Sequence, residues 1–256
     1  MSGRGPSVDE MDAPTALPDS IGIAAPDEWI QIPTETGEFD RFRTRLEQAW
    51  IDADWDRTTR RRAELLLNRI RRELTRVCVQ YASVYVAEPS EEDRRLGEDI
   101  PGATDLPDQG DPDDEVLMST CTVGMYSRAG LGATLPLSLG NLMMAYGSKP
   151  SGVDGDDLQR ITNLEPPMVH DLAIGTSVRL RRLYEFEKPG VLPQRYYGES
   201  FITPLGDDEH ILIAHFTTPN LPLSRVFSEL FEAVAGTIEL FYPDDPTTFS
   251  SDWVDA

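Results

Sequence analysis

Two strand-like segments that flank a short polar turn constrain the fold most strongly. "RYYGESFIT" (195–203) and "HILIAHFTT" (210–218) are rich in β-branched and aromatic residues, and "PLGDDE" (204–209) between them is typical of a turn. This pattern predicts an antiparallel hairpin. The preceding "SVRLRRLYEFE" (177–187) alternates apolar and charged residues, so we expect a three-strand meander with one polar face.

Two longer segments also show a period of two and predict further strands. They cover residues 77–87 and 116–126, and both contain apolar residues at most positions. The connection at 88–115 holds twelve acidic side chains, four prolines and no periodicity, which is typical of a disordered acidic loop. We expect the two strands to pair as a hairpin across this loop.

Apolar residues at helical spacing predict four helices, over about 39–53, 57–76, 139–146 and 223–234. For the last helix, Asn220 is a candidate N-cap and Pro222 suits the first turn. "TIELFY" at 237–242 then predicts a short strand or docking segment. The predicted fold class is therefore α+β, with a single mainly antiparallel β-sheet flanked by helices. We expect a disordered leader at 1–20, one domain at 27–245 and a tail at 246–256.

The charge balance bears on the partners of the protein. The chain of 256 residues has a formal net charge of −22, which disfavours binding to nucleic acid or to an anionic membrane surface. The stretch from Arg57 to Arg76 holds eight arginines, but a charge run on an amphipathic helix is more often a solvated face. Arginine greatly outnumbers lysine, which suggests a GC-rich genome, and the acidic composition also suits a salt-loving source.

No segment has the pattern of a signal peptide or of a membrane span. We therefore expect a cytoplasmic protein without membrane insertion. Cys78 and Cys121 lie in predicted strands and lack metal-ligand spacing, so we expect small buried side chains, with a disulfide between neighbouring strands as the alternative.

The motifs of the common catalytic and cofactor-binding classes are missing. The glycines match neither a phosphate-binding P-loop nor the dinucleotide fingerprint, and no GxSxG or HExxH pattern occurs. His170, His210 and His215 do not form a local metal-ligand set. We therefore predict no cofactor, no metal and no catalytic residue of a recognised class.

Five residues are candidates for partner binding. Arginine and tyrosine dominate binding hot spots, so Arg179 and Arg181 with Tyr196 and Tyr197 are expected to form an exposed anchor patch, the alternative being cross-strand packing. His215 shares a strand face with Ile211 and is expected near a strand end, where an imidazole touches both core and solvent.

Two stretches carry a resemblance to a known family. "LAIGTSVRLRRL" at 172–183, and 199–240 with its "TPN" junction and closing helix, are similar to actinobacterial lipoproteins of the LpqN type, and the predicted order of elements resembles the PsbP-like fold. The chain lacks their signal and lipidated cysteine. Because members of this fold are accessory proteins, the resemblance implies a binding role and transfers no catalytic residues.

The sequence thus favours a non-enzymatic accessory or interaction protein. It is expected to bind a protein partner or a small ligand through a sheet face or the loops at strand ends. The alternative hypothesis is a hydrolase-like enzyme of unrecognised mechanism, in which His215 acts with a nearby carboxylate.

Overall fold

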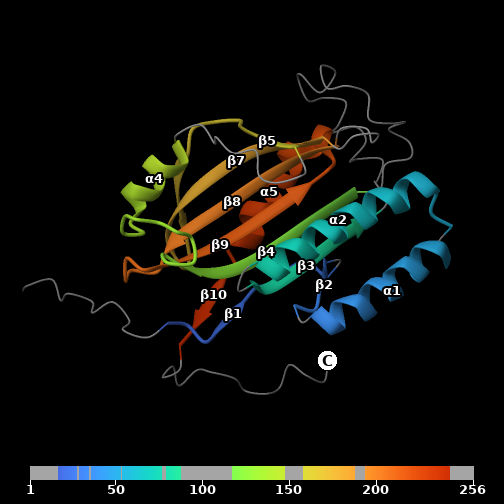
Figure 1. The fold of residues 1–256 in the computed structure, drawn as a ribbon, viewed down its shortest axis with the longest axis horizontal. Coiled ribbons are helices and arrows are strands. Elements are labelled where there is room, and N and C mark those ends of the chain that lie inside the picture. The colour runs from blue at the N-terminus through green and yellow to red at the C-terminus, as the bar shows by residue number, and fades with distance from the viewer. Residues whose placement is uncertain are drawn as a thin grey trace, which may run out of the picture.

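An eight-stranded antiparallel sheet forms the centre of the structure, a computed structural model. Its strands lie in the order β2-β3-β4-β9-β8-β7-β5 (Figure 1). The eighth strand, β6, pairs with β7 on the same side as β5. A separate two-stranded sheet joins β1 to β10. The structure describes residues 17–27, 29–34, 36–52, 54–76, 79–87, 117–147, 158–187 and 194–242.

The strands have the following bounds: β1 (Ser20–Gly22), β2 (Trp29–Gln31), β3 (Val79–Ala87), β4 (Leu117–Ser127), β5 (Leu158–Asn163), β6 (Met168–Leu172), β7 (Gly175–Glu187), β8 (Gln194–Pro204), β9 (His210–Thr218) and β10 (Glu239–Phe241). The helices are α1 (Thr36–Asp52), α2 (Arg57–Arg76), α4 (Leu139–Gly147), the 3₁₀ turn η3 (Leu221–Leu223) and α5 (Ser224–Ala235).

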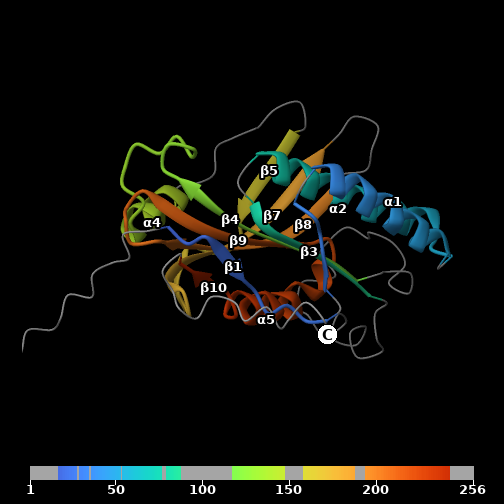
Figure 2. The same cartoon turned by 90° about the horizontal axis from the view of Figure 1, so that it is seen from below.

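Helices cover both faces of the sheet. Figure 2 shows α1 and α2 on one side and α5 on the other. Because side chains alternate across a strand, each face builds its own core. The α5 face is aromatic, with the Phe216 and Phe231 rings stacked at 4.9 Å and Tyr197 stacked on Phe231 at 6.4 Å. The opposite face packs under α2 at one end and under α4 at the other.

The predicted fold class is confirmed, and the two predicted hairpins form. β3 pairs with β4, and β8 pairs with β9. The expected polar face of the meander is wrong, because helices cover both sides of β7–β9. Three strands were not predicted from the sequence. β5 and β6 form one edge of the sheet, and β1 includes Ser20 of the predicted leader. Cys78 and the acidic loop at 88–115 lie outside the described residues.

Asn220 has a different role from the predicted helix cap. Its side chain makes no cap hydrogen bond in η3 and instead accepts one from the backbone N–H of Met118 at 2.8 Å. Thr218 donates to the carbonyl of the same methionine at 2.6 Å. The "TPN" segment therefore ties the end of β9 to β4, and Pro222 lies in η3 and not in the first turn of α5.

The turn between β8 and β9 is organised by Asp207. Its carboxylate accepts hydrogen bonds from the backbone N–H groups of Glu209 and His210, at 2.9 and 2.8 Å, and contacts the His210 ring at 2.6 Å. Partial burial opposes the charged form, but these hydrogen bonds outweigh burial and lower the pKa of Asp207.

We expect Asp207→Asn to weaken folding at neutral pH and to have little effect in acid. Because the folded-state pKa is lowered, the stabilisation is complete above the ordinary value of 3.8 and disappears as the pH falls through the folded-state value. The side chain is one-third exposed, so the expected loss is at most about 1 kcal/mol. Urea unfolding of both proteins from about pH 7 to about pH 2.5 measures it. A difference that stays constant over this range would contradict the assignment.

Candidate functional site

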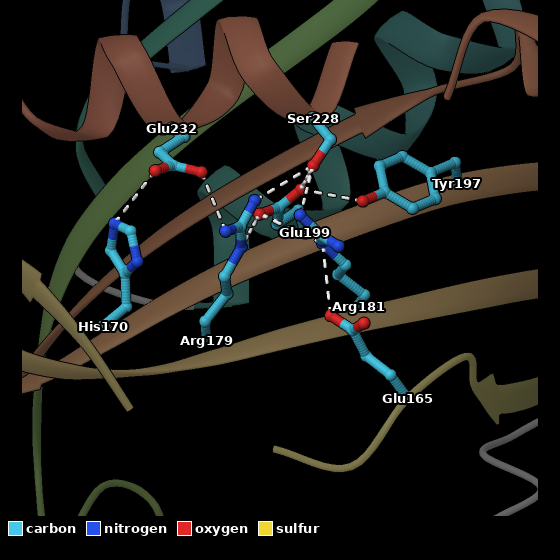
Figure 3. Close-up of polar contacts among 8 residues, drawn as sticks. All are labelled: Glu165, His170, Arg179, Arg181, Tyr197, Glu199, Ser228 and Glu232. Atoms are coloured by element: carbon cyan, nitrogen blue, oxygen red, sulfur yellow. Dashed lines mark hydrogen bonds and ion pairs between the residues drawn. The ribbon is translucent and has the colours of Figure 1, made fainter. Parts of the chain in front are cut away.

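A buried carboxylate lies at the centre of a polar cluster between the sheet and α5. Glu199 on β8 is 0% exposed and shares its strand face with Tyr197 and Phe201. Arg179 lies on the α5 face of β7, diagonally across from Glu199, whose direct register partner is Arg181. It is 7% exposed and donates through Nε to the Glu199 carboxylate (Figure 3). Two opposite charges are thus held together inside the protein.

The other oxygen of Glu199 accepts from Tyr197 and from Ser228 of α5, each at 2.8 Å. Ser228 in turn accepts from Arg179 at 3.0 Å and from Arg181 at 2.8 Å. One hydroxyl therefore uses its single donor and both acceptor positions. These hydrogen bonds offset the cost of burying the charges of Glu199 and Arg179, because buried charges are stable only when they are paired and hydrogen-bonded.

The electrostatics of the cluster favour its present protonation state. Burial opposes the charged form of Arg179, but the charges of Glu199 and Glu232 outweigh it and raise the arginine pKa. Burial, together with the charge of Glu199, also raises the pKa of Tyr197. The phenol therefore stays protonated and donates to Glu199.

The cluster reaches solvent along one rim. Arg179 Nη1 lies 2.8 Å from Glu232 on α5, and the other oxygen of Glu232 lies 3.7 Å from His170 of β6. Arg181 is half-buried, with its Nε 3.3 Å from Glu165. Figure 3 shows how Glu165, His170 and Glu232 surround the buried centre.

Exposed apolar side chains lie beside this rim. Met168 is 40% exposed and lies opposite Arg179 in the β6–β7 register, so it shares the α5 face. Val169 is 55% exposed on the other face of β6, and Leu164, whose backbone N–H donates to Arg181, is 52% exposed. We call Leu164, Glu165, Met168, Val169, His170, Arg181 and Glu232 the edge surface.

The predicted exposed anchor patch is wrong for three of its four members. Arg179, Tyr196 and Tyr197 are buried, and only Arg181 keeps access to solvent. Tyr197 points toward α5, whereas Tyr196 faces the other core and packs edge-on against Phe186. On an interior strand such as β8, neighbouring tyrosines cannot form one patch, because successive side chains point to opposite faces of the sheet.

His215 lies in the middle of the sheet instead of near a strand end. It is half-buried on the face opposite α5, between Thr122 of β4 and Ser200 of β8. Its Nδ1 lies 2.8 Å from the Ser200 hydroxyl, and the Tyr184 ring packs edge-on at 5.8 Å. These contacts are with a hydroxyl of the neighbouring strand β8 and with a ring of β7, one strand further away, and the hydrolase alternative stays a hypothesis.

The sequence contained one overlooked signal for the cluster. Glu199 lies between Tyr197 and Phe201 on one strand face, and a lone acid between two aromatics indicates a buried, paired charge. Ser228 similarly interrupts the apolar stripe of α5 next to Phe227. No comparable signal pointed to Glu165, His170 or Glu232, which the topology brings together from separate segments.

A comparison with known protein-family models gives no match, and a comparison with curated proteins gives none either. Within the described ranges, no helix has the length and apolar character needed to cross a bilayer. The same ranges contain no group of three or more His, Cys, Asp or Glu side chains that could hold a metal ion. Cys121 is a free thiol buried in the α5-side core.

Proposed function

We propose that the protein is a non-enzymatic interaction protein that binds a protein partner through the edge surface. The observation that carries this proposal is the exposure of Leu164, Met168 and Val169 beside charged groups held in fixed positions. Apolar side chains grouped at a surface and surrounded by polar ones are typical of protein–protein contacts. Rigid presentation lowers the entropy cost of binding. The resemblance to accessory proteins of the PsbP-like fold also supports it.

Arg181 is the anchor of this proposal. It is the one arginine of the predicted patch that reaches solvent, and its guanidinium is oriented by Glu165 and Ser228. An arginine already held in one rotamer loses little further freedom on binding, which favours it as a hot-spot residue. Arg179 is buried beneath the edge surface and holds the Glu232 carboxylate in place through an ion pair.

We expect a photoreactive benzophenone amino acid at position 169 to form a specific adduct with one partner protein in native cells. The matched control places the same group at Ile51 on α1, which is 52% exposed against 55% for Val169 but lies far from the edge surface. Mass spectrometry of the adducts identifies the partner, and Arg181→Ala should reduce the yield from position 169 at least about tenfold. Identical adducts from both positions, or none from position 169, would refute the proposal.

A further inference from the structure

The outermost strand of the edge surface has backbone groups that point away from the sheet. Among the strands that the structure describes, β6 pairs with β7 alone, in a register that sets Met168 opposite Arg179 and His170 opposite Ser177. The Leu164 N–H donates to the Arg181 carbonyl at 2.9 Å, so the odd-numbered residues of β7 turn their backbone groups toward this edge. Because antiparallel ladders alternate, Met168 and His170 pair with β7, and the N–H and C=O groups of Val169 and Asp171 point outward.

The two edges of the sheet differ in how they are protected. The opposite edge, β2, has three residues, its Trp29 is buried, and the Trp29 N–H is already bonded to the Pro26 carbonyl. β6 has five residues, and its outward positions carry an exposed valine and an exposed aspartate. No described residue forms a backbone hydrogen bond with those positions. Natural sheets usually block such an edge, so its openness indicates a place where another strand can pair.

The charges around β6 determine which kind of segment can pair with it. Glu165, Glu199, Glu232 and Asp171 contribute four carboxylates near this edge, against the two guanidinium groups of Arg179 and Arg181. Both arginines are already paired within the cluster, so the excess charge is negative, as is the charge of the whole chain, −22. A basic segment is therefore favoured and an acidic one is repelled.

We infer that β6 binds an extended, basic segment of the partner protein as an additional strand of the sheet. This inference rests on the proposed function and adds how the partner binds. Main-chain hydrogen bonds to Val169 and Asp171 supply affinity, and apolar side chains of the segment contact Val169 on the face opposite α5. Lysine or arginine side chains of the segment point to the α5 face, where they meet Glu165 and Glu232.

A synthetic ten-residue peptide of alternating valine and lysine is the probe. In ¹⁵N-labelled intact protein, we expect it to slow hydrogen exchange of the Val169 and Asp171 amides at least about tenfold, while the Gln31 amide on β2 is unchanged. The same peptide with alternate N-methyl groups, and a valine–glutamate peptide, should have no such effect. Slowing by all three peptides, slowing at Gln31 as well, or no slowing would overturn the inference.

Two proline variants test the backbone directly. Val169→Pro removes one outward donor and leaves the β7 pairing intact, because proline is tolerated on edge strands where its missing N–H faces solvent. We expect it to weaken probe binding at least about tenfold, and Gln31→Pro on the other edge to leave it unchanged. Equal binding by both folded variants would overturn strand addition. If position 169 still forms a specific adduct in cells, the proposed function survives that failure, whereas a missing adduct means that the proposed function itself has failed.

Discussion

Glu199→Ala is expected to lower the free energy of unfolding by about 3–5 kcal/mol. The substitution leaves Arg179 buried without its main partner and removes the acceptor of Tyr197 and Ser228. An uncompensated buried charge is the main cost, and the loss of the carboxylate hydrogen bonds adds to it. Urea unfolding followed by tryptophan fluorescence measures the effect.

A paired apolar substitution separates the charge from the packing. Arg179→Met with Glu199→Leu should recover most of the stability lost in Glu199→Ala, because an apolar pair of similar volume needs no charge compensation. The matched control is Glu229→Ala on the exposed side of α5, where we expect a change within about 0.5 kcal/mol. Equal losses in the single and double variants would show that the pair does not carry the stabilisation.

Phe231→Ala should be about as damaging, with an expected loss of about 3–5 kcal/mol. The ring is fully buried and stacks on Phe216, and its removal leaves a cavity between α5 and the sheet. Because Phe231 also contacts Tyr197, the variant should additionally increase hydrogen exchange along α5.

Leu230→Ala on the same helix is the control for this second prediction. Leu230 is only partly buried at the border of the same core, so we expect a loss of about 1 kcal/mol or less. Neither substitution lowers helix propensity appreciably, since leucine and alanine are both strong helix formers and alanine is a better helix former than phenylalanine. Similar losses in the two variants would mean that α5 is not held by its aromatic stripe.

Strong periodicity made the centre of the fold predictable from sequence. The strand pairs β3–β4 and β8–β9 follow from apolar residues with a period of two, and α5 follows from its apolar stripe. β6 was missed because "MVHDL" is short and partly exposed, and a strand with one paired side and little burial needs no strong pattern. Its assignment depends on pairing with β7, which is a tertiary contact.

The site was harder to predict than the fold for a related reason. A period of two correctly placed Arg179 and Arg181 on one face of β7, but solvent exposure depends on which helix lies over that face. α5 covers Arg179 and supplies Ser228, a partner 49 residues away in the chain. Local patterns therefore identified the residue types of the cluster, and the position of α5 decided which of them remained at the surface.

The pairing of β1 with β10 has a mechanical consequence. Ser20 lies opposite Phe241 and Gly22 opposite Glu239. The chain therefore enters β1 and leaves β10 at the same end of this small sheet. A force pulling residues 17 and 242 apart loads the ladder one hydrogen bond at a time, as in unzipping, instead of shearing all bonds together. The two-stranded sheet lies away from β5 in Figure 1, so under tension it can open first while the opposite side of the large sheet keeps its shape.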